Sequence, residues 1–146
     1  MTKITSRGAK PVGKAAGLAA GLIVALALIG SNTVARAATI TVDSIADDTN
    51  AGHCTLREAI NSANGSSGTA DCSAGTGTDT IVFSVTGTIT LGSKLPVVAG
   101  NLTVTGPVAP GVTVDCDNKF QVAEVEMSAT LNLNKLTTTF PSRHLF

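Results

Sequence analysis

Short segments rich in β-branched residues recur along most of this chain and determine its fold class. From Ile81 onward these segments begin every six to ten residues, and Gly, Asn, Pro or Asp separates each one from the next. β-Branched residues favour strands, and the separating residues favour tight turns. Short strands at regular spacing predict an all-β architecture, which could be a sandwich, a barrel or a β-solenoid. The segments are 39–42, 80–83, 86–91, 95–98, 102–105, 112–115, 120–122 and 129–133.

One segment departs from the strand pattern and predicts a short α-helix over residues 55–64. Thr55 and Glu58 have the spacing of a capping box, in which each side chain accepts a hydrogen bond from the backbone N–H of the other residue. Because so short a helix is marginal alone, it must pack on something apolar. Here it can cover the open end of a stacked β core. Its apolar stripe consists of Leu56, Ala59, Ile60 and Ala63.

The run 54–59 resembles the Cys-Ser-Leu-Arg-Glu-Ala motif of the CSLREA domain, and Thr55 in place of Ser keeps the capping hydroxyl. The resemblance covers nearly all of residues 39–136. It implies the start of a right-handed parallel β-helix with a short N-terminal capping α-helix, in a secreted or surface-exposed bacterial protein. Residues 38–78 are then expected to form the cap, and residues 79–137 the first coils. The resemblance implies no particular chemistry, because the cap and not an active site defines the family.

The N-terminal segment 1–37 has the layout of a helical secretory signal peptide. It carries five cations and no acid, and residues 15–29 form an uncharged apolar run. Ala35 and Ala37 then place small residues at the −3 and −1 positions of a cleavage site before Ala38. An uncleaved membrane anchor is the alternative, but about 15 helical residues span only roughly 22 Å of a ~30 Å hydrocarbon core. We therefore expect a protein that is secreted or exposed on a bacterial surface and has no membrane segment after cleavage.

The family pattern breaks off near the C-terminus. Residues 138–146 depart from the expected continuation of the repeat, so we expect an aberrant or truncated tail there. With three short strands in each coil, the chain supplies about two coils, whereas solenoids generally need at least about three repeats. One expectation is a fragment of a larger surface protein. A chain that self-associates through the open end of its β-helix and a self-sufficient small surface-binding module are the alternatives.

Three cysteines lie in the part of the chain that would be exported, where disulfides persist. Cys54 and Cys72 are the candidate disulfide pair, and a bond between them would remove about 3 kcal/mol of loop-closure entropy from the unfolded chain. Cys116 is then left over, either as a buried free thiol or with a partner elsewhere. A zinc site that uses His53, Cys54 and Cys72 lacks a fourth ligand at ordinary spacing.

Two clusters of Asp and Asn would supply oxygen ligands for calcium, but neither has the spacing of an EF-hand loop. Turn-forming residues on a solvated corner are the preferred interpretation of both clusters. Arg57 is expected to bond coil carbonyls or an acid near the cap, because adjacent helical residues such as Arg57 and Glu58 do not face each other as a catalytic pair would. The clusters are Asp43, Asp47, Asp48 and Asn50, and then Asp115, Asp117 and Asn118.

Composition excludes several classes of function. The exported part would have a formal charge of −5, which argues against a nucleic-acid binder, and its lack of Trp and Tyr removes the usual platforms for sugar stacking. No nucleophile elbow, phosphate-binding glycine loop or histidine pair is present. We expect a non-catalytic structural or adhesive module without cofactor, whose partner is a cell-surface or extracellular carbohydrate or protein. The alternative is the N-terminal part of a polysaccharide lyase or glycoside hydrolase whose catalytic coils are missing.

Overall fold

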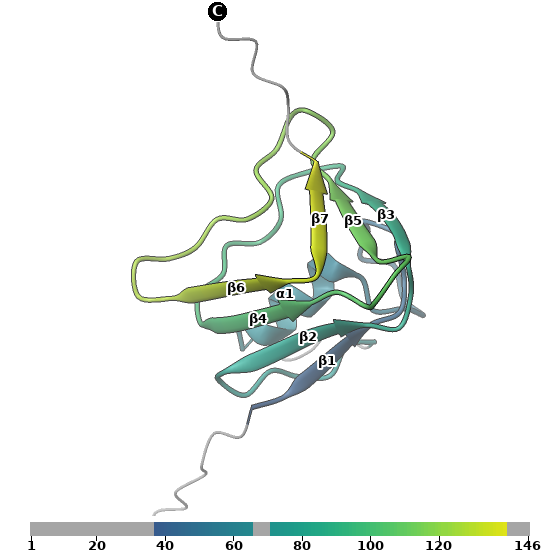
Figure 1. Cartoon of the computed structure of the whole chain (residues 1–146). Helices are drawn as coiled ribbons and strands as arrows, with labels where there is room; N and C mark the ends of the chain where they lie inside the picture. Colours follow the sequence, from purple (N-terminus) through teal and green to yellow (C-terminus); the bar gives the residue numbers. More distant parts are fainter. Residues whose placement is uncertain (1–36, 66–70, 140–146) are drawn as a thin grey trace, which may run out of the picture. The chain divides into compact units, whose positions relative to one another are not determined.

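Short strands dominate the computed structural model of the chain, which describes residues 37–65 and 71–139 (Figure 1). The prediction of a mainly β fold is confirmed, while the expected signal peptide lies outside the described residues. A single α-helix of eight residues follows the first strand in the described part of the chain. In chain order the elements are β1 (Thr39–Val42), α1 (Leu56–Ala63), β2 (Asp79–Phe83), β3 (Gly87–Thr90), β4 (Asn101–Thr105), β5 (Val112–Asp115), β6 (Thr130–Asn134) and β7 (Leu136–Thr139).

The strands form two parallel sheets, and the chain alternates between them. One sheet has the order β1-β2-β4-β6 and the other has the order β3-β5-β7 (Figure 1). From β2 to β5, each strand pairs in parallel with the strand two positions further along the chain, and β1 pairs in parallel with β2. A third region of contact is a parallel bridge between Val98 and Val125, in the segments that lead from the second sheet back to the first. Neither sheet closes into a barrel.

The strand register stacks apolar side chains in columns that form the core. Ile40 is paired with Ile81, Ile81 with Val104, and Val104 with Leu133. The first three of these side chains are almost fully buried, whereas Leu133 is 43% exposed. Successive residues of a strand point to opposite faces, so the alternate positions form an outer polar column. In the first sheet this outer column consists of Thr39, Thr80, Thr103 and Asn132.

Two of the expected strands differ from the observed structure. Residues 120–122 form no strand, because Asp117 and Asn118 adopt left-handed backbone conformations and turn the chain sharply. The Phe120 N–H is consequently bonded to the Cys116 carbonyl at 3.1 Å, within this turn and not in a sheet. Of the expected strand 95–98, only the bridge at Val98 is present.

The last described strand runs past residue 137, where the expected coils end. Residues 138 and 139 belong to β7 and pair with Val114 and Asp115. The regular structure thus continues at least to Thr139, and the rest of the expected tail lies outside the described residues.

Candidate functional site

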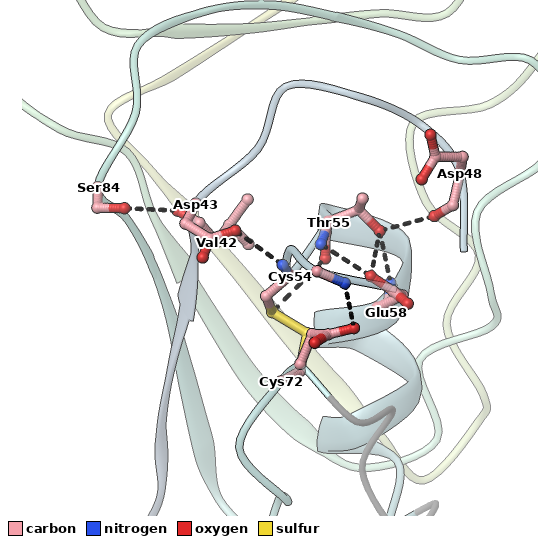
Figure 2. The surroundings of a disulfide bond; sticks show 10 residues. Val42, Asp43, Asp48, Cys54, Thr55, Glu58, Cys72 and Ser84 are labelled. Carbon is pink, nitrogen blue, oxygen red and sulfur yellow. Dashed lines mark hydrogen bonds between the residues drawn. A yellow bond between two sulfur atoms is a disulfide. The ribbon is translucent and has the colours of Figure 1, made fainter. Parts of the chain in front are cut away.

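The N-terminus of α1 is fixed by a capping box. The Thr55 hydroxyl accepts from the Glu58 backbone N–H at 3.3 Å, and the Glu58 carboxylate accepts from the Thr55 N–H at 3.1 Å (Figure 2). The same hydroxyl donates to the carbonyl of Asp48 at 2.9 Å, so the box also holds the preceding loop. Thr55 and Glu58 are buried, and their polar atoms satisfy backbone groups at a helix end that would otherwise lack partners.

The apolar stripe of α1 faces the core. Leu56, Ala59 and Ile60 are buried, and Ala63 is partly buried and packs against the core cluster. The helix contacts β1 and β2, the first two strands of the four-stranded sheet. The helix, which belongs to neither sheet, therefore supplies apolar side chains to the core.

A disulfide links Cys54, which precedes the N-cap of α1, to the loop after the helix. Cys54 and Cys72 are joined with a Cα–Cα separation of 5.0 Å, within the usual range for a disulfide (Figure 2). Asp43, at the end of β1, accepts from the Cys54 N–H at 2.7 Å through its side chain. The Asp43 backbone N–H donates to the Cys54 carbonyl at 3.0 Å. The start of the helix is therefore tied both to β1 and to the loop near Cys72.

Arg57 and Asp47 form a paired site at one edge of the segment 92–99. The Arg57 guanidinium donates to both carboxylate oxygens of Asp47, at 2.9 and 2.8 Å, in the bidentate geometry of a strong ion pair. It also donates to the carbonyls of Ser93 and Lys94, at 3.0 and 2.6 Å. Asp47 in turn accepts from the Gly92 N–H at 2.8 Å. The expectation that Arg57 bonds coil carbonyls or an acid agrees with this geometry, which has both.

Asn64, the C-cap of α1, continues this set of bonds further along the same segment. Its side-chain amide donates to the Val97 carbonyl at 2.7 Å and accepts from the Ala99 N–H at 2.9 Å. On the opposite side of the segment, Val98 makes the equivalent bonds to the backbone of residues 124–126. The Asn64 amide thus takes the place that the backbone of a neighbouring strand would occupy.

We call Asp47, Arg57 and Asn64 the edge cap, since together they satisfy backbone groups of the segment 92–99 on the side that faces α1. Two of these roles were missed in the sequence. The sequence predicts only a turn residue or calcium ligand at Asp47 and only the last residue of the helix over 55–64 at Asn64. No local spacing indicates either role, because their partners lie 45 and 33 residues away.

The side chains considered above as metal ligands have other partners in the structure. Cys54 and Cys72 bond to each other, so neither thiolate is available for zinc, and His53 pairs with Asp48 at 3.0 Å. Asp43 and Asp47 accept bonds from different backbone and side-chain donors. Within residues 37–65 and 71–139, no group of three or more His, Cys, Asp or Glu side chains has the geometry of a metal site.

The second Asx cluster also stabilises a turn. Asp115 accepts from the Asp117 N–H at 3.1 Å and from the Thr139 hydroxyl at 2.9 Å. Asp117 pairs with Lys119 at 2.6 Å, and Asn118 occupies a left-handed turn position. Cys116, between these residues, is a buried free thiol whose pKa is raised by burial.

The hydrogen bond between His53 and Asp48 perturbs both groups. It is the main cause that raises the pKa of His53 above its ordinary value. The pKa of Asp48 is lowered, chiefly by the hydrogen bond from the Asn50 backbone and then by the bond to His53. Both side chains are partly exposed at the corner before α1, so the pair sits where solvent screens it.

Comparisons with protein-family models, with curated proteins and with solved structures find no match to this chain. The CSLREA assignment therefore remains a prediction from the motif. A search of the described residues for a membrane-spanning helix finds none of sufficient length and apolar character.

Proposed function

We propose that this chain is an exported, non-catalytic structural or adhesive module of the CSLREA type, which caps the N-terminal end of a right-handed parallel β-helix on a bacterial surface. The course of the strands supports this proposal. The chain passes from one parallel sheet to the other and back, with a third line of contact at Val98 and Val125. Three contact regions per turn are what a three-sided solenoid requires.

The observation that carries the proposal is the edge cap. An exposed strand edge offers unpaired N–H and C=O groups to other chains, and natural β proteins cover such edges. Here Arg57 and Asn64 from the helix, and Asp47 from the loop before it, take up those groups along the segment 92–99. The helix thus terminates strand pairing on this side, which is the function of a cap.

The chemistry of the buried acids supports a non-catalytic role. Glu58 serves the helix cap, Asp47 serves the edge cap, and Asp79 accepts several backbone N–H groups. Carboxylates that accept such hydrogen bonds stabilise the fold and are not placed to act as general acids or bases. The disulfide supports export, because disulfides persist in oxidising compartments.

The opposite end supports a role in association. β6 and β7 have no further strand beside them among the described residues, and Leu133 of β6 is 43% exposed. Neither strand contains a charged residue that would discourage pairing. We propose that this edge receives further coils or another protein, with a surface carbohydrate as the alternative partner.

The cap is tested by removing its side-chain bonds in the full-length chain. We expect R57A/N64A to self-associate at concentrations where the parent does not, measured by size-exclusion chromatography with light scattering. The control is Val42→Ala, which destabilises the buried core but leaves the edge cap intact. The two variants are compared at urea concentrations that give them the same free energy of unfolding. If the two variants associate to the same extent, the cap does not block pairing and the proposal fails.

A local readout accompanies this test. The Ala99 N–H donates to the Asn64 side chain, so its hydrogen exchange should accelerate in Asn64→Ala. The Val98 N–H donates to the Glu124 carbonyl, so its exchange should change little. Equal acceleration at both amides would indicate general unfolding and not the loss of a cap.

A further inference from the structure

We propose that buried Asp79 is the receptor for the new amino terminus that signal-peptide removal creates at Ala38. The inference rests on the proposed export of the chain and adds to it a defined structural consequence of processing. The bond cut on export would lie next to the first residue that the fold holds in place.

The geometry at Ala38 supports this role. The Ala38 nitrogen donates to Asp79 Oδ1 at 2.9 Å, and the Ala38 carbonyl accepts from the Thr80 N–H at 2.9 Å. Ala38 is thus fixed on both sides immediately before β1, whereas Ala37 is exposed. The nitrogen that cleavage would release is therefore already bonded to the folded protein.

Two independent observations select the same peptide bond. In the sequence, small residues at Ala35 and Ala37 mark the bond between Ala37 and Ala38 as the cleavage site. In the structure, the nitrogen of that same bond lies 2.9 Å from a carboxylate that is only 1% exposed. Cleavage one residue earlier or later would place the terminal nitrogen elsewhere.

The Asp79 carboxylate is surrounded by backbone N–H donors. Besides Ala38, its oxygens accept from the Thr76 N–H at 3.1 Å and from the Gly77 N–H at 3.2 Å. The loop approaches so closely that a Cβ atom on Gly75 would lie 2.7 Å from Asp79 Oδ2. Among residues 37–65 and 71–139, no Lys, Arg or His side chain forms an ion pair with Asp79. A buried carboxylate with only neutral donors lacks the opposite charge that best offsets its burial.

Processing supplies this charge. Hydrolysis breaks the C–N bond between Ala37 and Ala38, and one water is consumed. Its oxygen completes the Ala37 carboxylate, and its two hydrogens convert the Ala38 N–H into an ammonium group. The neutral N–H donor to Asp79 thereby becomes a cation that donates to the same oxygen, and a charge-assisted bond is stronger than a neutral one.

This ion pair has a defined pH dependence. An α-amino group ordinarily titrates at a pKa of about 7.7–8.0, and an adjacent carboxylate raises that value. The added stability is therefore fully present below about pH 7.7 and is lost as the pH rises through the raised pKa of the folded protein. A rise of about one unit corresponds to an approximately tenfold smaller unfolding equilibrium constant below that range.

The experiment uses the full-length chain exported by a bacterial host. Intact mass identifies the amino terminus of the purified product. Selective acetylation of its α-amino group then restores a neutral N–H at Ala38, as in the precursor. We expect acetylation to raise the unfolding equilibrium constant about tenfold at pH 6.5 and to have no effect near pH 11. In Asp79→Asn, acetylation should have no effect at either pH.

The outcomes separate this inference from the proposed export. A cytoplasmic product that retains residues 1–37 would overturn both, whereas an envelope-bound product that retains them would leave export standing and overturn the role of Asp79. A product that begins at Ala38 but is insensitive to acetylation would leave export standing and overturn the role of Asp79. If Asp79→Asn does not fold, NMR titration of the α-amino group in the parent protein decides the question. An α-amino pKa within its ordinary range would contradict the inference.

Discussion

The two ends of the core have similar inward-facing residues but very different environments. At the N-terminal end, Ile40 and Ile81 are fully buried, with α1 packed against their strands. At the C-terminal end, Leu133 continues the same column but is 43% exposed. A small apolar cavity of about 30 Å³ lies beneath this last layer. The difference teaches that an apolar inward position is buried only when another layer covers it, and here the covering layer is a helix and not a strand.

Truncation along this column gives the largest expected contrast. Ile81→Ala should destabilise the protein by about 2–5 kcal/mol, because it leaves a cavity in a closed layer. Leu133→Ala should cost less than about 1.5 kcal/mol, since much of that side chain already contacts water. Urea unfolding of both variants measures the two values. Equal losses would mean that the C-terminal end is covered in solution, for example by self-association.

Removal of the disulfide tests how far the capped end depends on covalent support. The 18-residue separation of Cys54 and Cys72 predicts a loss of about 3 kcal/mol in C54A/C72A, through the larger entropy of the unfolded chain. Reducing agent should destabilise the parent to a similar extent and leave the double variant unchanged. A parent that is equally stable with and without reductant would show that packing of α1 alone holds this end.

The features that hold the N-terminal end of the core differ in how well the sequence predicts them. The capping box, the helix over residues 55–64 and the disulfide pair were predictable because they depend on local spacing or on a small choice of cysteines. The edge cap was not predictable, since Asn64 bonds a segment 33 residues away. Asp79 was missed for the same reason, because its bond to Ala38 spans 41 residues. An Asx residue near a turn looks alike in sequence whether it caps a distant strand edge or only a local loop.

Asn64 provides the sharpest test of the edge cap. Asn64→Ala leaves the Val97 carbonyl and the Ala99 N–H without their partner, which should cost about 1–2 kcal/mol. Asn64→Asp keeps an acceptor for Ala99 but places a second acceptor opposite the Val97 carbonyl, so it should not restore stability. Thermal unfolding at neutral pH compares the three proteins. If the aspartate variant matched the parent, the amide donor would contribute nothing to the edge.

The smallest expected effect concerns the His53–Asp48 pair, which lies at the corner before the helix. Because the His53 pKa is raised by its bond to Asp48, the protonated form stabilises the fold below the ordinary value of about 6.5, and this contribution is lost as the pH rises through the raised pKa. The pKa of Asp48 is lowered, so the ionised carboxylate stabilises the fold at higher pH. This contribution to stability is lost as the pH falls through the lowered pKa.

NMR titration of the His53 ring measures this contribution directly. In Asp48→Asn the His53 pKa should return toward its ordinary value, while overall stability changes little because solvent screens the pair. An unchanged titration would mean that the corner is not held by this bond in solution. The N-terminal end would then depend on its buried contacts alone, namely the capping box, the disulfide and the edge cap, none of which has a counterpart in the described C-terminal strands.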